Sequence, residues 1–160
     1  MLFTLGGYSH GSLDDMKEML QHPKSALGLS DGGAHCGVIC DASAPTYMLS
    51  HWARDRANGL PLEFVVKKMT RDTAHLYGLE DRGVLAPGYK ADLNLVDHEH
   101  LNLRLPEMVH DLPAGARRLI QRADGWKATI CAGEVTFEDG EHTDARPGRL
   151  IRGGQPVPLG

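Results

Sequence analysis

Apolar positions in the first part of the chain follow the pattern of a helix and then of a short strand. Residues 12–21 place apolar side chains at the spacing of one helix face, with acidic residues in the first turn, where the helix dipole favours them. His22 and Pro23 end this predicted helix. Residues 26–29 form a short apolar run, which predicts a buried strand that ends at Asp31. The pattern therefore predicts one α/β step.

Three further helical segments follow this predicted strand. A helix is predicted over residues 46–58, because Pro45 suits the first turn and apolar side chains recur at helical spacing. The same spacing predicts a helix over residues 62–69 and another that begins at Thr70 or Asp72 and ends at Tyr77, and Gly78 suits the position just after the last of them. Three helices after one strand are more than a single β/α step needs.

The second half of the chain changes to strand-like patterns from about Arg82. Turn residues such as Pro87-Gly88 and Gly133 separate short runs in which apolar and polar residues alternate. Residues 98–125 show little periodicity and many turn residues, so they are predicted mainly as loops. The predicted strands are residues 83–86, 91–97, 127–132 and 134–137. This half is therefore predicted to be a small β unit.

Composition and charge suit a globular protein of about one domain. The chain has 160 residues, of which 41% are hydrophobic and 24% charged, and its formal net charge is −4. A mildly acidic chain gives no electrostatic case for binding nucleic acid or an anionic membrane. No apolar run approaches the roughly 18 residues that a membrane-spanning helix needs. We therefore expect neither a nucleic acid nor a membrane partner.

Cysteine usage and the start of the chain bear on the cellular compartment. Cys36, Cys40 and Cys131 form no even disulfide framework, which favours a reducing compartment. The first residues lack the basic region and the long apolar core of a signal peptide. A cytoplasmic location is the simplest expectation.

The clearest candidate for chemistry is the Gly-rich stretch that follows the predicted strand at residues 26–29. Asp31 would lie at the carboxyl end of this strand, Gly32 and Gly33 would let a ligand approach the backbone, and His35 follows. In barrel enzymes catalytic residues lie at this end of the strands. The alternative is that Asp31 only caps a turn, since Asp-Gly is a common turn pair.

Other reactive residues each have a structural alternative. Cys36 and Cys40 have a spacing that zinc tolerates, but no second Cys/His pair accompanies them, so partly buried thiols are favoured. Arg54, Asp55 and Arg56 could hold a substrate carboxylate, although a solvated helix end with local ion pairs is the more common role of such a run.

Two more clusters are interpreted in the same way. His98 and His100 have the His-x-His spacing of a metal site, but their place in the β unit argues against ligation. Arg117, Arg118 and Arg122 form a small basic cluster, and nearby acids argue against anion binding. Aromatic side chains at helical spacing are predicted to be core, namely Tyr47, Trp52, Phe64 and Tyr77. The scattered histidines are interpreted as surface or hydrogen-bonded side chains, namely His10, His22, His51, His75, His110 and His142.

Several motifs, in order, resemble one enzyme family. Residues 83–97 (GVLAPGYKADLNLVD) resemble the strand pair with which amidohydrolase-superfamily enzymes re-enter their β-sandwich, and residues 130–135 (ICAGEV) resemble its final strand. Residues 30–35 (SDGGAH), 51–56 (HWARDR) and 145–149 (ARPGR) are most similar to the D-aminoacylase, or N-acyl-D-amino-acid deacylase, branch.

This resemblance implies a fold class and a domain division. The family fold is a metal-dependent (β/α)₈ barrel with a β-sandwich, so the implied class is α/β. Residues 1–81 would be the end of the barrel, including its eighth strand, and residues 82–160 would be part of the sandwich.

The resemblance also implies a site. Asp31 would be the eighth-strand acid that takes a proton from metal-bound water and passes one to the leaving amine, and it would also be a metal ligand. His35 and Gly33 would bind the substrate, an N-acyl-D-amino acid, and Zn²⁺ would be the cofactor. The other family ligands, including the His-x-His of the first strand, have no counterpart before Asp31. The chain therefore looks like the C-terminal part of such an enzyme, inactive alone, with His-x-His expected in any sequence upstream.

Three alternatives stay open. The parent enzyme could be a cyclic-amide hydrolase of the dihydroorotase or hydantoinase type. The chain could instead be a non-catalytic folded remnant, or an assembly partner for a complementary N-terminal fragment. Because a closed barrel cannot form from one or two β/α units, self-association through exposed apolar surface is expected.

Overall fold

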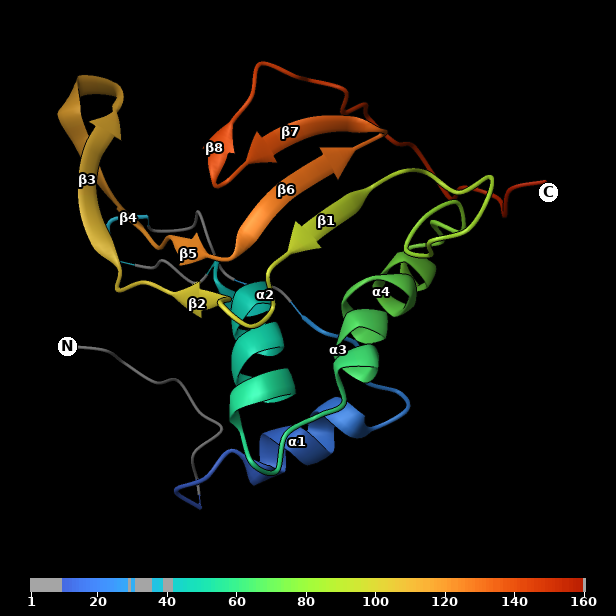
Figure 1. Cartoon of the computed structure of the whole chain (residues 1–160), viewed down its shortest axis with the longest axis horizontal. Coiled ribbons are helices and arrows are strands. Elements are labelled where there is room, and N and C mark those ends of the chain that lie inside the picture. Colours follow the sequence, from blue (N-terminus) through green and yellow to red (C-terminus); the bar gives the residue numbers. More distant parts are fainter. Residues whose placement is uncertain (1–9, 29, 31–35, 39–41, 160) are drawn as a thin grey trace.

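The computed structural model describes residues 10–28, 30, 36–38 and 42–159 (Figure 1). The chain combines helices in its first half with antiparallel strands in its second half, which agrees with the predicted α/β class. The division at residues 81 and 82 stays a prediction. The helical elements are α1 (Asp14–Gln21), α2 (Ala44–Tyr47), the π-helix η1 (Met48–Asp55), α3 (Leu62–Met69) and α4 (Arg71–Leu76).

Every predicted helix is present, but the one predicted over residues 46–58 is not a regular α-helix. It begins as α2, with Pro45 in its first turn as expected, and continues as η1, whose turns are wider. The N–H of Arg56 donates to the carbonyl of His51 at 2.9 Å, five residues back, which is the hydrogen bond that defines a π-helix. Gly78 adopts φ +69° just past α4, as a helix-ending glycine should.

The strand predicted at residues 26–29 is wrong over the residues that the structure describes. Residues 26–28 and Ser30 have no regular secondary structure, whereas residue 29 lies outside the described ranges. A strand needs a neighbour for its ladder of hydrogen bonds, and none of the described strands pairs with this segment. Its apolar side chains serve the core instead, since Leu27 packs against the buried cluster.

The second half forms one sheet and two ribbons, all antiparallel. The sheet has four strands in the order β1-β6-β7-β8, with Leu93 opposite Ile130 and Val96 opposite Trp126. The ribbons are β2-β5 and β3-β4, and η2 closes the second of them. The strands are β1 (Leu93–Val96), β2 (Asn102–Leu103), β3 (Glu107–Leu112), β4 (Ala116–Ile120), β5 (Ala123–Asp124), β6 (Trp126–Cys131), β7 (Glu134–Glu138) and β8 (Glu141–His142), with the 3₁₀ turn η2 (Pro113–Gly115).

Two of the strand predictions for this half are wrong. Residues 83–86 form no strand, and only the turn at Pro87-Gly88 is present. Residues 98–125, predicted mainly as loops, contain four short strands. These strands carry little apolar periodicity because the hairpin β3-β4 is largely exposed and is held by charged cross-strand pairs.

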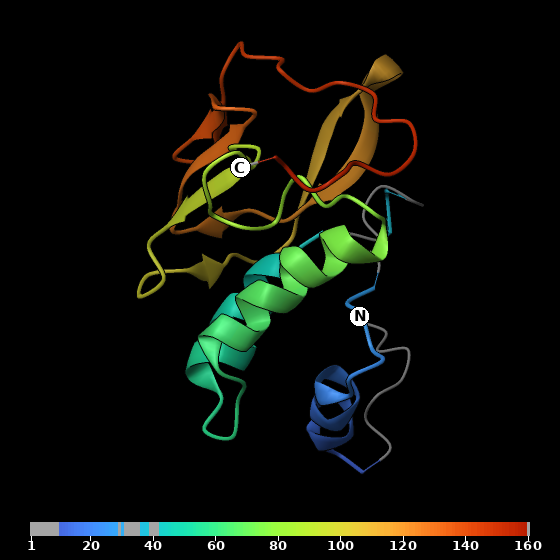
Figure 2. The ribbon, with the colours of Figure 1, turned by 90° about the vertical axis from the view of Figure 1, so that its right-hand side faces the viewer.

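The hydrophobic core lies where the helices meet the start of the β region (Figure 2). Trp52 is 2% exposed, and Val65 and Leu101 are fully buried beside it. Trp126 reaches the same cluster, and its indole N–H donates to the hydroxyl of Thr46 at 3.0 Å. Helices and strands therefore share one core.

The prediction that four aromatic residues are core holds only in part. Trp52 is buried and Phe64 packs against the core. Tyr47 is 37% exposed and Tyr77 is 73% exposed. Tyr77 follows the last residue of α4 as its C-cap, so its ring is not on the helix face that the spacing assumes. No helix in the described ranges is long and apolar enough to cross a membrane.

Candidate functional site

The predicted catalytic residue Asp31 and the predicted substrate-binding residues Gly33 and His35 lie outside the described residues. The predicted role of Asp31 as a metal ligand therefore also lies outside the described residues. Cys40, one of the two cysteines with zinc-like spacing, lies outside them as well. The described chain resumes at residues 36–38, directly after this stretch.

The segment that leaves the predicted catalytic stretch lies against strand β4. The N–H of Leu119 donates to the carbonyl of Cys36 at 2.6 Å. A Cβ on Gly37 would lie 3.7 Å from Nε of Arg117, so this arginine crosses the backbone at Gly37. The β3-β4 hairpin therefore supports one side of the segment that follows Asp31 in sequence.

Acids neutralise most of the basic cluster on this hairpin. Arg118 donates through Nε and Nη2 to the two carboxylate oxygens of Asp111, each at 2.7 Å, and this bond lowers the pKa of Asp111. Arg122 pairs with Glu107 at 3.3 Å. Among the described residues Arg117 has no acidic partner. The cluster thus offers one cation, not three, to an anion.

The run Arg54-Asp55-Arg56 holds elements of the fold together. Arg54 pairs with Asp55 at 2.6 Å and also donates to the carbonyl of His98. Arg56 pairs with Asp14 of α1 at 2.6 Å. Hydrogen bonds from the arginines lower the pKa of both aspartates. The ion pairs favour the structural interpretation over the binding of a substrate carboxylate.

The two histidines at His-x-His spacing are turned to different partners. Nε2 of His98 donates to the carbonyl of Leu49 in η1 at 3.0 Å. Nδ1 of His100 donates to the carboxylate of Asp97 at 2.9 Å, which lowers the pKa of that carboxyl. They do not converge on one point, as metal ligands must.

The described residues do not fit a zinc site. No group of three or more His, Cys, Asp or Glu side chains in the described ranges is close enough to hold a metal ion. The metal ligand that the family resemblance implies for this chain is Asp31, which lies outside the described residues.

The environment of His51 in η1 is a feature that the sequence did not reveal. Its ring stacks on Tyr47 with centroids 4.6 Å apart and meets the edge of Trp52 at 5.4 Å. Its Nε2 is buried without a hydrogen-bond partner, which corrects its interpretation as a surface or hydrogen-bonded histidine. Nε of Arg56, whose guanidinium lies 5.1 Å from the Trp52 ring centre, is buried without a partner as well. The i, i+4 spacing of Tyr47 and His51 is the signal that could have revealed this stack.

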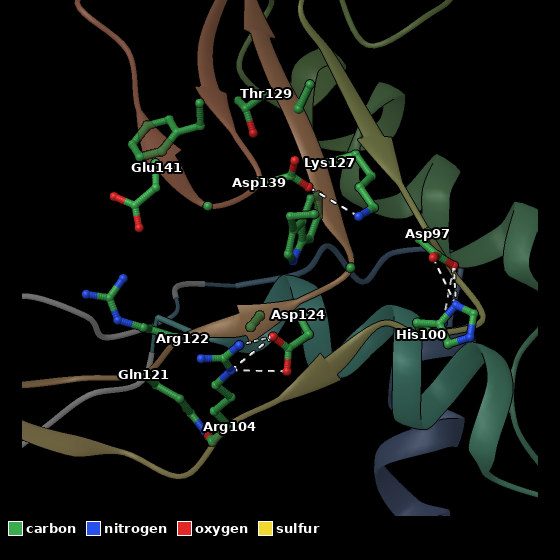
Figure 3. A pocket seen from close by; sticks show the side chains of 16 residues that line it. Asp97, His100, Arg104, Gln121, Arg122, Asp124, Lys127, Thr129, Asp139 and Glu141 are labelled. Carbon is green, nitrogen blue, oxygen red and sulfur yellow. Dashed lines mark hydrogen bonds and ion pairs between the residues drawn. The ribbon is translucent and has the colours of Figure 1, made fainter.

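A broad cavity of about 870 Å³ separates the four-stranded sheet from the β2-β5 ribbon (Figure 3). Trp126, Thr129 and Phe137 line it together with charged side chains. Most of these charges are paired, namely Arg104 with Asp124, Lys127 with Asp139, His100 with Asp97, and Arg122 with Glu107. Glu141 also lines the cavity and has no ion pair among the described residues. The cavity therefore presents mainly neutralised charges and one carboxylate outside these pairs.

Comparison with known proteins identifies the class. Residues 7–137 match the Amidohydrolase family, and the chain belongs to this family. It is 39% identical over 100 residues to N-acyl-D-aspartate deacylase of Alcaligenes xylosoxydans xylosoxydans, covering 62% of this chain and 18% of that protein. It is 36% identical over 105 residues to D-aminoacylase of the same organism, covering 65% and 19%. These matches confirm the resemblance to the D-aminoacylase branch.

One solved structure is also similar to this chain in sequence. A D-aminoacylase described as defining a novel subset of amidohydrolases matches with 29% identity and a TM-score of 0.48, covering 63% of this chain and 19% of that one. The chain thus spans about a fifth of the length of the curated relatives it matches.

Proposed function

We propose that this chain is part of a hydrolase that cleaves the amide bond of N-acyl-D-amino acids. One observation carries the proposal. The family match runs through the stretch that contains Asp31, and the two relatives that match are named as deacylases of this kind.

In this proposal Asp31 is the general acid and base of the reaction. Its carboxylate takes a proton from the attacking water as the water adds to the amide carbonyl, then passes a proton to the leaving nitrogen as the C–N bond breaks. The products are the free carboxylic acid and the D-amino acid. His35 and the backbone at Gly33 contact the substrate. Zn²⁺ enters through the resemblance alone.

The proposal includes an assignment of fold. Residues 1–81 would be the end of a (β/α)₈ barrel, and residues 82–160 part of a β-sandwich. The helical first part and the antiparallel second part support this division.

A second candidate is an assembly role without catalysis by this chain. Large apolar side chains are exposed, among them Leu105 at 90% and Leu85 at 84%. The chain also spans only about a fifth of its relatives. We therefore propose self-association, or pairing with a complementary N-terminal fragment, as the alternative.

Hydrolysis assays test the catalytic proposal. The purified chain would be assayed with zinc on N-acetyl-D-methionine, N-acetyl-D-aspartate and hydantoin, alone and mixed with the N-terminal part of the D-aminoacylase relative. We expect turnover of an N-acyl-D-amino acid in the mixture. Asp31→Asn should reduce it at least ~100-fold, because general acid–base catalysis contributes about 10²–10⁴.

Asp72→Asn is the matched control, since Asp72 pairs with Lys67 in the helical region, away from the hairpin, and its loss should leave turnover unchanged. Turnover of hydantoin alone would favour a cyclic-amide hydrolase. Association of the two fragments without turnover of any substrate would favour the assembly role. Equal rates for Asp31→Asn and the unaltered chain would contradict the role of Asp31.

A further inference from the structure

The π-helix η1 holds an imidazole in an environment that favours its neutral form. The ring of His51 lies nearly parallel to Tyr47, with an interplanar angle of 8°, and perpendicular to Trp52, with an angle of 87°. Its Nε2 is buried without a hydrogen-bond partner. A protonated imidazole carries N–H donors on both nitrogens, so protonation of His51 would place a charged donor at a point with no acceptor.

The charged groups around this ring oppose protonation on balance. Arg56 repels a positive charge at His51, while Asp55 attracts it and is itself held by Arg54. Burial and the field of Arg56 together lower the pKa of His51 below its usual value. Asp14 of α1 is engaged by Arg56.

The neighbouring elements bring no further anion to the ring among the described contacts. Lys68 of α3 donates to the carbonyl of Ser25. His98, from the loop after β1, donates to the carbonyl of Leu49. The acids with described contacts to this region, Asp14 and Asp55, are both already paired with arginines.

The helix that carries His51 is also the joint between the helical region and the strands. The carbonyl of Leu49 accepts from His98, and Thr46, one turn earlier, accepts from Trp126. The carbonyl of Trp52 accepts from the N–H of Leu60 at 2.7 Å, which fixes the connection to α3. A change at His51 is therefore transmitted to contacts with both regions.

We propose that His51 is a pH-sensitive lock, whose neutral ring keeps η1 packed and whose protonation in mild acid releases η1 from the strands. The sign follows from the geometry: the folded state favours the neutral ring more than the unfolded chain does. Stability is then lost as the pH falls below the unfolded value of about 6.5. This inference is independent of the proposed catalytic function.

Amide hydrogen exchange of the full chain at about pH 7.5 and pH 5.5, corrected for the intrinsic rate, tests the lock across the histidine range. We expect protection of residues 48–56 to fall more than protection of α3, by up to ~10-fold, because an unfolded histidine with a pKa of about 6.5 takes up its proton over this pH range while the folded ring resists it. His51→Phe keeps an aromatic ring that cannot be charged, and this extra loss should disappear. His22→Gln, at an exposed position, should behave like the unaltered chain.

Equal pH dependence of residues 48–56 and α3 in the unaltered chain would overturn the proposal. So would the same extra loss in His51→Phe. If that variant does not fold, an NMR titration of the His51 ring in the unaltered chain decides the matter. A pKa at or above about 6.5 would refute the lock, and a lower one would support it.

Discussion

Single polar contacts at buried positions join the two regions of this chain. The indole N–H of Trp126 on β6 donates to the hydroxyl of Thr46 in α2, which is itself buried. The bond is part-buried, so removing one partner forfeits the bond and leaves the other partner only partly solvated. This pair therefore contributes to the attachment of the sheet to the helices.

Removing the hydroxyl tests this contact. We expect Thr46→Val to lower the free energy of unfolding by about 0.5–1.5 kcal/mol, since it removes a part-buried hydrogen bond. Trp126→Phe removes the donor, and Thr46→Val should then cost less in that background. Urea unfolding of the two single variants and the double variant measures the coupling. Additive losses would show that the hydrogen bond contributes nothing.

At the residue scale, the sequence predicts which side chains are chemically reactive better than it predicts which groups surround them in the fold. Asp31 stands out because Asp-Gly-Gly after an apolar run is a local pattern with a known family counterpart. His51 does not, because its unpaired nitrogen depends on the rings that fold around it. For Arg54 and Arg56 the sequence predicted ion pairs but not all of their partners. Asp14, the partner of Arg56, is brought to it by tertiary packing.

At the scale of elements, the connection between β5 and β6 is the tightest point in the β region. Gly125 lies there with φ +93°, and a Cβ would stand 2.8 Å from Cα of Leu101 and 2.9 Å from the carbonyl oxygen of Asp97. The N–H of Asp97 also donates to the carbonyl of Gly125 at 2.8 Å. The backbone of the connection between β1 and β2, at Asp97 and Leu101, and the backbone of this turn touch without a side chain between them.

Alanine at this turn should therefore be disruptive. Gly125→Ala is expected to destabilise the chain by about 1–3 kcal/mol more than Gly140→Ala, because only the first adds a clash in a packed region. Gly140 is the matched control: it has φ +86° and no described atom within 4 Å of its Cβ position. Urea midpoints of the two variants give the difference. Equal losses would mean that the positive φ alone, and not the contact, sets the cost.

Helices were predictable from the sequence and several strands were not, for physical reasons. Residues 62–69 were placed correctly because a helix satisfies its own hydrogen bonds and shows one apolar face. Residues 26–28 carry apolar side chains but lack a strand to pair with. The hairpin β3-β4 was missed because cross-strand pairs such as Arg118 with Asp111 take the place of alternating apolar residues.

At the scale of the whole molecule, apolar surface is distributed over both regions. Tyr77 in the helical region and Leu105 in the strand region are mostly exposed, at 73% and 90%. Large apolar side chains left in water favour association with any apolar surface that can cover them.

We therefore expect the purified chain to self-associate as its concentration rises. Sedimentation velocity over a range of concentrations, with binding of a hydrophobic dye, measures this. Leu105→Lys should lower both signals, whereas Lys24→Gln, at an exposed polar position, should not. A monodisperse monomer that binds no dye would contradict the expectation.

The shared core has a consequence for the way the chain is made. Trp126 finds Thr46 across 80 positions of sequence, and fully buried Leu101 packs in the cluster that contains Trp52 and Val65. During synthesis the amino-terminal helices leave the ribosome first. They must wait, with Trp52 uncovered, until the strands have been translated. A nascent chain that ends before Leu101 therefore exposes apolar surface to which a chaperone that shields such segments can bind.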